Sequence, residues 1–286
     1  MNSAERQKNS QRLMRNFTWL SMQEVLIRVI GLATAIYLAR VLSPATYGAL
    51  GLALAIVGVV QTLVHAGTGS RATRLTALDP ASVPETYAQI TGFRLTVAVL
   101  IMTILILNAP ALSGVFSFPT DLLILCSFML LRPAFVVIWA FRGLDRMHVT
   151  AMAEVTEKAV VFAGLLILVK GFGNDYFWIP VLEVSAALLM VWWLRKRLSM
   201  IYPNLSIEFR FRQWPEITRE SLPLGLAALL GSVYLHGAIL MVGWLDTSES
   251  AANFLVAQKM MLTMGILMHV INQAAFPSTS RLLSVD

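Results

Sequence analysis

Residues 48–66 read GALGLALAIVGVVQTLVHA, nineteen positions without one Asp, Glu, Lys or Arg. A helix needs about 20 mostly apolar residues to cross the hydrocarbon of a bilayer. Lipid offers no partner to unpaired backbone groups, and this run lacks the alternation of a barrel strand. Similar segments occupy residues 17–39, 90–109, 122–141, 151–169, 177–194, 222–244 and 251–276. The sequence therefore predicts an all-α, polytopic membrane helix bundle of about eight transmembrane helices.

The composition agrees with this class. Of the 286 residues, 57% are apolar and 13% are charged, against about 45–50% and about 25% in soluble domains. The net charge is +6, but the basic residues stand between apolar runs rather than on one amphipathic face, so no nucleic-acid partner is expected. The single cysteine, Cys126, lies within an apolar run, which excludes a disulfide framework and a cysteine-built metal site.

The basic residues also predict the orientation. With the tail, residues 1–16, in the cytoplasm, fifteen Lys and Arg residues outside the spans lie on the cytoplasmic side and two, Arg40 and Lys170, lie outside. The positive-inside rule then places both termini on the cytoplasmic side of the membrane. The longest loop, residues 195–220, is basic, and a plain solvated loop is favoured there over recognition of lipid headgroups.

An internal repeat predicts the domain organisation. Residues 35–48, AIYLARVLSPATYG, are similar to residues 238–251, AILMVGWLDTSESA. Each stretch contains the end of one span, a short polar turn and the start of the next span. The match implies two parallel lobes, although chance similarity between two hairpins stays open. We expect a six-helix N-terminal lobe at 17–194, a cytoplasmic loop at 195–220, and at 221–286 a second lobe that stops after its first hairpin.

Charged residues inside spans are costly, at about 2.5–3.5 kcal/mol each on insertion scales, and usually have a function or a partner. Arg28 is the deepest of them. It shares one helix face with Glu24, Gly31 and Ala35 at helical spacing. We expect Arg28 to contact an anionic substrate in a polar cavity lined by Glu24 and Arg28; a purely structural Glu24–Arg28 pair is the alternative.

Other charged residues are weaker candidates. Arg132 precedes Pro133 in mid-span, where proline should kink the helix, and helix discontinuities often border transporter sites. Arg94 is expected one turn inside the third span. Its side chain either has a function there or extends to the membrane interface by snorkelling. Lys158 is expected to pair with Glu154 one turn earlier. The remaining candidates, in the last two predicted spans, are Lys259 and His236.

Three motifs carry a family resemblance. Residues 37–57, YLARVLSPATYGALGLALAIV, resemble the first hairpin of the Wzx-type O-antigen flippases, polysaccharide transporters of the multidrug/oligosaccharidyl-lipid/polysaccharide exporter superfamily. Residues 141–146, FRGLDR, are similar to that family's loop after the fourth span, and residues 221–225, SLPLG, to the entry of its seventh. The resemblance covers nearly the whole chain, and its motifs are sparse and mostly structural.

The resemblance implies a protein of two six-helix lobes, so that this chain would be truncated after its eighth span. It implies transport of an undecaprenyl-diphosphate-linked oligosaccharide across the inner membrane by alternating access, with membrane lipids and polysaccharide assembly proteins as further partners. One departure concerns the seventh span. Many members carry a charged pair there, whereas residues 234–237, YLHG, leave only His236 as a titratable group.

The sequence lacks a phosphate-cradling Gly-rich loop, a metal-ligand pattern and a nucleophile elbow. We therefore expect no enzyme, no cofactor and no ATP-driven pump. A drug or organic-cation antiporter of the same superfamily should instead show a cavity dominated by carboxylates. A membrane polymerase or acyltransferase should show a large outer loop or a catalytic His/Asp motif. An inactive fragment is the last alternative.

Overall fold

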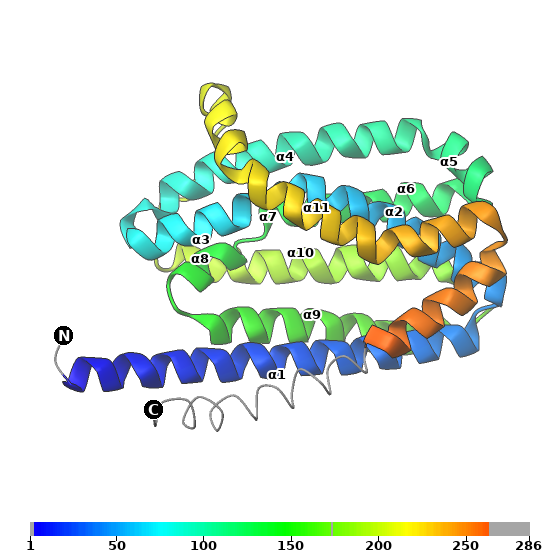
Figure 1. Ribbon diagram of the computed structural model, residues 1–286, viewed down its shortest axis with the longest axis horizontal. Helices are drawn as coiled ribbons and strands as arrows, with labels where there is room; N and C mark the ends of the chain where they lie inside the picture. Colours follow the sequence, from blue (N-terminus) through cyan, green and yellow to red (C-terminus); the bar gives the residue numbers. More distant parts are fainter. Residues whose placement is uncertain (1–2, 173, 263–286) are drawn as a thin grey trace, which may run out of the picture.

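The computed structural model describes residues 3–172 and 174–262, and in this part of the chain every regular element is a helix (Figure 1). The α-helices are α1 (Ser3–Val41), α2 (Pro44–His65), α3 (Thr68–Leu78), α4 (Val83–Leu107), α5 (Ala109–Phe116), α6 (Thr120–Ser127), α7 (Arg132–Phe135), α8 (Ile138–Gly143), α9 (Met147–Leu168), α10 (Trp178–Ser199) and α11 (Trp214–Leu245). Short 3-10 turns η1 (Pro80–Ser82), η2 (Phe128–Leu131), η3 (Asp175–Phe177) and η4 (Phe211–Gln213) join some of them. Residues 248–262 are also helical.

Five segments are long and apolar enough to cross a membrane: Pro44–Leu78, Pro80–Leu107, Thr120–Gly143, Asp175–Ser199 and Phe211–Leu245. Two more helices, α1 and α9, have the length and carry charged residues within them. The predicted class, an all-α polytopic membrane bundle, is thus confirmed. The count of eight spans stays a prediction, because the last segment, 251–276, lies partly outside the described residues.

The long helices run roughly side by side, so that their connections gather at two ends (Figure 1). Contacts between distant segments confirm this arrangement. Asn16 bonds Asp145 at 3.4 Å and Tyr202 bonds the Pro80 carbonyl at 2.7 Å at one end, while Tyr37 bonds the Val169 carbonyl at 2.6 Å and Ser248 bonds the Ser117 carbonyl at 3.2 Å at the other. Segments predicted on the same side of the membrane therefore lie together. Which end faces the cytoplasm stays a prediction.

Two boundaries differ from those expected. The tail, residues 1–16, was expected to be separate, but α1 begins at Ser3 and continues without a break into the first predicted span. Residues 3–16 contain neither Gly nor Pro. Apart from Ser and Asn, they are mostly good helix formers, such as Ala, Glu, Gln, Lys and Arg. The loop expected at 195–220 is shorter in the structure, because α10 extends to Ser199 and α11 begins at Trp214.

The turn before α2 uses its proline and glycine as the sequence predicts. The Ser43 hydroxyl caps α2 by accepting a hydrogen bond from the Thr46 amide at 3.2 Å, and Pro44 occupies the first turn, where no amide donor is needed. Gly48 faces the helix at 248–262. A Cβ built on Gly48 would lie 1.7 Å from the Ser248 carbonyl oxygen. The glycine is thus required for close approach between two helices.

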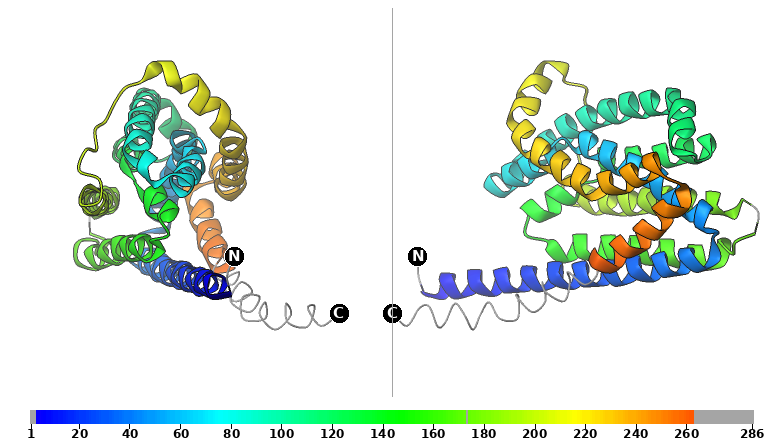
Figure 2. Two further views of the ribbon diagram at one scale, coloured as in Figure 1. Left: turned by 90° about the vertical axis from the view of Figure 1, so that its left-hand side faces the viewer. Right: turned by 45° about the vertical axis from the view of Figure 1, so that its right-hand side comes forward.

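The most extensive contact between two helices joins α2 and α11, far apart in the sequence. Gly243 of α11 lies against the side chain of Leu52, and a Cβ there would be 2.2 Å from a Leu52 methyl carbon. Viewed along the helices, α11 lies on one side of the molecule and the α9–α10 pair lies on another (Figure 2). Helix α11 is therefore anchored on α2 rather than on α9 or α10.

The fourth predicted span, 122–141, is broken rather than continuous. Helix α6 tightens into η2, α7 lasts one turn, Val136 is extended with φ −67° and ψ 124°, and α8 then begins. Pro133 lacks an amide donor, and its ring clashes with the preceding turn, which weakens the helix at this point. The expected discontinuity at Arg132–Pro133 is confirmed, and it opens the bundle beside the charged residues described next.

Candidate functional site

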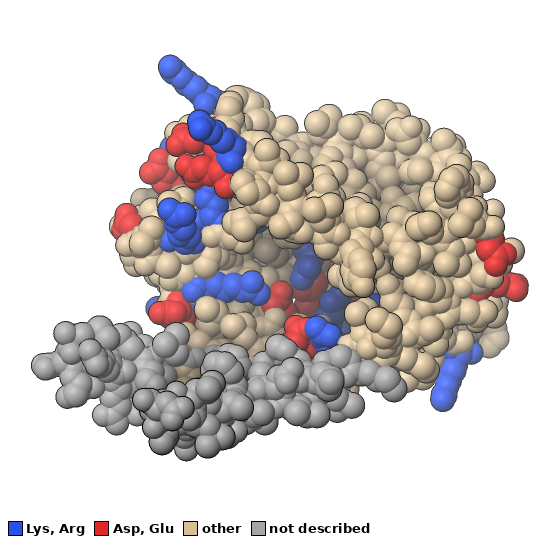
Figure 3. All heavy atoms as spheres, in the orientation of Figure 1, with Lys and Arg blue, Asp and Glu red and all other residues tan. Residues whose placement is uncertain are grey.

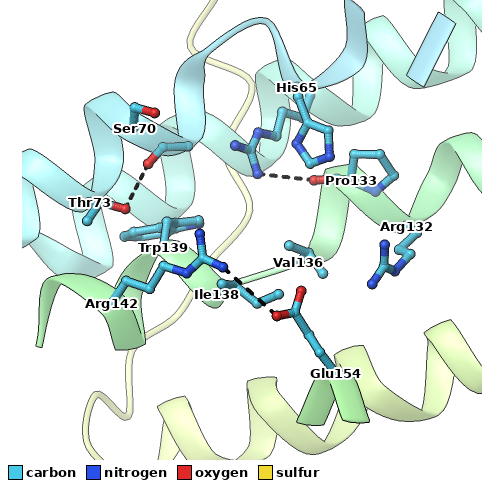
Figure 4. A pocket seen from close by; sticks show the side chains of 12 residues that line it. His65, Ser70, Thr73, Arg132, Pro133, Val136, Ile138, Trp139, Arg142 and Glu154 are labelled. Atoms are coloured by element: carbon cyan, nitrogen blue, oxygen red, sulfur yellow. Dashed lines mark hydrogen bonds and ion pairs between the residues drawn. The ribbon is translucent and has the colours of Figure 1, made fainter. Parts of the chain in front are cut away.

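A cavity of about 270 Å³ lies at this break. We call it the arginine cavity (Figure 4). Its lining comes from α2, α3, α4, α9 and the broken segment, and consists of His65, Gly69, Ser70, Thr73, Arg94, Arg132, Pro133, Val136, Ile138, Trp139, Arg142 and Glu154. Segments separated by about ninety positions in the chain therefore converge on one polar space.

Arg94 forms the fixed part of the wall. It is 1% exposed; its Nε donates to the Thr68 hydroxyl at 2.7 Å and its Nη1 to the Pro133 carbonyl at 3.1 Å. Its Nη2 is buried and has no hydrogen-bond partner in the described part of the chain. The snorkelling alternative for Arg94 is wrong, because α3 and α7 supply acceptors that hold the guanidinium inside the bundle.

Arg132 connects two cavities. Its Nη2 contacts Glu157 of α9 at 2.8 Å, and its Nε is buried without a described partner. The same side chain lines a second cavity of about 160 Å³, together with Lys158 and Glu183. A charged group that borders two spaces and retains an open donor can contact a ligand in either.

Arg142 faces the cavity from the opposite wall. Figure 4 shows its guanidinium directed toward Glu154 across the cavity, with 3.9 Å between Arg142 Nη2 and Glu154 Oε2. Gln23 of α1 donates a hydrogen bond to the same carboxylate. The contact between Arg142 and Glu154 is long for an ion pair, so both groups keep capacity for another partner.

The charge balance of the arginine cavity favours an anion. Its lining holds three arginines and, among the described residues, one carboxylate, Glu154. Guanidinium groups match phosphate and carboxylate geometry through paired N–H donors. Figure 3 shows one face of the molecule, where blue and red side chains gather in a hollow within a largely uncharged surface. The site can hold a negatively charged group within a membrane bundle.

Of the predicted site residues, the structure brings Arg94 and Arg132 together and places the others elsewhere. Arg28 contacts Glu24 at 2.5 Å and donates to the Leu262 carbonyl at 3.2 Å. Neither Glu24 nor Arg28 lines the arginine cavity or the second cavity. Glu24 and Arg28 thus form an ion pair, on a helix that packs mainly on α9. That the pair lines a substrate cavity stays a prediction.

The two candidates from the last predicted spans make different contacts. His236 Nδ1 is 3.0 Å from the Ser232 carbonyl in its own helix, and its ring packs on Gly58 of α2. Lys259 interacts electrostatically with Lys158 and Glu183. A role for either residue in binding stays a prediction.

The expected pairing of Lys158 with Glu154 is wrong. Lys158 contacts Glu183 of α10 at 2.9 Å, while Glu154 turns toward Arg142 and Gln23. The reason is the helix packing: Glu154 and Lys158 sit on the same helix, but α9 is flanked by α1, α8 and α10. These neighbours offer partners of opposite charge in a less polar setting than the helix surface.

Sequence reasoning missed His65, Trp139 and Arg142 as cavity residues. Arg142 had been counted among the loop charges that fix orientation, and His65 among the last residues of an apolar span. The signal that could have found Arg142 is the Arg132–Pro133 break, since a broken span returns its following residues toward the interior. For His65 and Trp139 we find no such signal.

Comparison with known proteins identifies relatives. Residues 13–283 match the family described as polysaccharide biosynthesis protein. A candidate O-antigen transporter of Shigella dysenteriae is 24% identical over 255 residues, which cover 86% of this chain and 62% of that protein. The chain thus spans less than two thirds of the length of this curated relative. No solved structure matches. Because the family match extends over most of its length, the chain belongs to the polysaccharide biosynthesis protein family of membrane proteins.

Proposed function

We propose that the chain forms the substrate-binding part of a flippase that moves an undecaprenyl-diphosphate-linked oligosaccharide across the bacterial inner membrane. The observation that carries this proposal is the arginine cavity, with three arginines, one carboxylate and an open donor on each of Arg94 and Arg132. The name of the Shigella relative supports the class of cargo. A diphosphate supplies the anion that such a cavity needs.

The energetics favour a function for these arginines. Each charged residue deep in a span costs about 2.5–3.5 kcal/mol on insertion scales. Arg132 recovers part of this cost from Glu157, but Arg94 is held by a hydroxyl and a carbonyl, without a carboxylate among the ion pairs of the described residues. A phosphate group would supply the missing negative charge and accept from the open Nη2 of Arg94.

The place of the cavity suits loading from the cytoplasm. Ser70, Thr73 and Arg142 belong to segments at the end that the basic residues predict to be cytoplasmic, where lipid-linked sugars would be loaded. Alternating access would then carry the diphosphate past the break at Val136, where the backbone departs from helical geometry. Both terminal segments would stay on the cytoplasmic side.

A drug or organic-cation antiporter is the competing function. Its cavity should carry a carboxylate excess to attract cations, whereas the arginine cavity carries a cation excess. Glu154 is the carboxylate of this cavity, and it already has Arg142 and Gln23 beside it. We therefore favour an anionic substrate.

The test uses a strain that lacks its own flippase and therefore lacks surface polysaccharide. The chain is expressed alone and together with a supplied second half, and surface polysaccharide is measured. We expect restoration by at least one of the two combinations, and its loss in Arg94→Gln and Arg132→Gln at unchanged membrane abundance. The control Lys170→Gln, at an exposed site near the opposite end, should keep full activity. Failure of both combinations, or full activity in both arginine variants, would reject the proposal.

A further inference from the structure

A groove between α9 and α10 lies on the outside of the bundle and is separate from the transport site. It encloses about 360 Å³. Two small buried residues, Ala153 and Ala186, form its floor, and three exposed ones, Met152, Leu189 and Trp192, form its rims. The depth of the groove follows from this arrangement, because alanines face each other where larger side chains would close the gap.

The groove is almost entirely apolar. Its one charged lining residue among those described, Glu157, is 4% exposed and is paired with Arg132 behind the groove floor. No free charge therefore points outward from the floor. An apolar groove on the outside of a membrane protein accommodates a hydrocarbon chain.

The end of the groove carries unpaired cations. Arg195, Lys196 and Arg197 follow the groove tryptophans in α10 after one residue, Leu194, and are all exposed. Lys196 Nζ lies 5.2 Å from the ring centre of Trp192, and Arg197 Cζ lies 4.7 Å from that of Trp193. None of the three cations forms an ion pair with a described carboxylate.

We propose that this groove binds an anionic phospholipid, with an acyl chain between α9 and α10 and the phosphate at Lys196 and Arg197. The occupant follows from charge complementarity: the apolar lining fits the chain, and cations held over the groove tryptophans by cation–π contacts fit the phosphate. If these basic residues only set the orientation of the protein in the membrane, neither the groove nor the cations held over its tryptophans would be needed. The site is independent of what the cavity transports.

The experiment measures tryptophan quenching by lipids with brominated acyl chains. Purified protein is placed in nanodiscs that contain a small fraction of brominated phosphatidylglycerol or, in parallel, brominated phosphatidylcholine. We expect stronger quenching by phosphatidylglycerol, and we expect the Trp192→Phe/Trp193→Phe variant to lose this difference. Each basic residue near a membrane surface contributes about fivefold in affinity, corresponding to ~1 kcal/mol. Lys196→Gln and Arg197→Gln should each reduce the preference by about that factor.

Two matched controls separate the site from general charge effects. Arg212→Gln removes an exposed charge from the neighbouring loop, and it should leave the preference unchanged. Ala186→Phe fills the groove and should reduce quenching by both lipids, whereas Ala159→Phe, exposed on α9 outside the groove lining, should not. Equal quenching by the two lipids would overturn the proposal, because the groove would then select the chain and not the headgroup.

Discussion

Glu157→Gln is the most informative single change, since it removes the partner of Arg132 without changing side-chain size. The Glu157 side chain is 1% exposed and that of Arg132 is 29% exposed. Breaking a fully buried ion pair costs about 3–5 kcal/mol. We expect about 2 kcal/mol here, because glutamine still accepts a hydrogen bond and Arg132 reaches the cavity. With about 2–4 °C per kcal/mol for a chain of this size, the melting temperature should fall by roughly 4–8 °C.

The assay is thermal unfolding of the purified protein in detergent, followed by intrinsic fluorescence. The double variant Glu157→Gln/Arg132→Gln removes both charges and should recover most of the loss, because no lone charge remains inside the bundle. Transport should not return in the double variant, since Arg132 is proposed to contact the substrate. Glu249→Gln, at an exposed carboxylate, serves as the control. An unchanged melting temperature in Glu157→Gln, or normal transport in the double variant, would refute this reasoning.

Three further predictions concern other parts of the molecule. The double change Glu24→Gln/Arg28→Gln should keep both stability and transport if the pair is structural, and should abolish transport if Arg28 clamps the substrate; the flippase-null strain decides between them. Gly48→Leu should lower the yield of folded protein, measured by size-exclusion chromatography, because any side chain there meets the Ser248 carbonyl; Gly31→Leu, with open space around its Cβ position, should not. Cysteine labelling at residues 117, 174 and 248, in a chain without Cys126, should mark all three as outside, and protection of any one of them would contradict the predicted orientation.

The fold was largely predictable from the sequence because its governing signal, the length of uncharged apolar runs, is local. Residues 48–66 need no partner to be identified as a membrane helix. The break near Pro133 was predictable from the proline, although Pro223 lies inside the continuous helix α11, so a proline alone does not decide where a helix is interrupted. Boundaries were less accurate, as α1 shows: its first turns are polar, and hydropathy does not detect a polar helix.

The site was only partly predictable, because it depends on which helix faces meet. Depth in a span singled out Arg28, Arg94 and Arg132, of which Arg94 and Arg132 line the arginine cavity. Depth says nothing of which neighbour lies opposite. Lys158 illustrates the limit. Its spacing from Glu154 suggested a pair within one helix, and the packing of α10 on α9 supplied Glu183 instead. Such choices are made by tertiary contacts that a single sequence does not record.

The contact between Arg132 and Glu157 means that an anion that binds Arg132 through Nη2 competes with a carboxylate already in place. A ligand that draws Arg132 away must compensate the desolvated Glu157 that it leaves behind. The net affinity is then lower than three arginines alone would give. In the proposed flippase, Glu157 would pair again with Arg132 when the cargo leaves, which would favour release on the far side of the membrane.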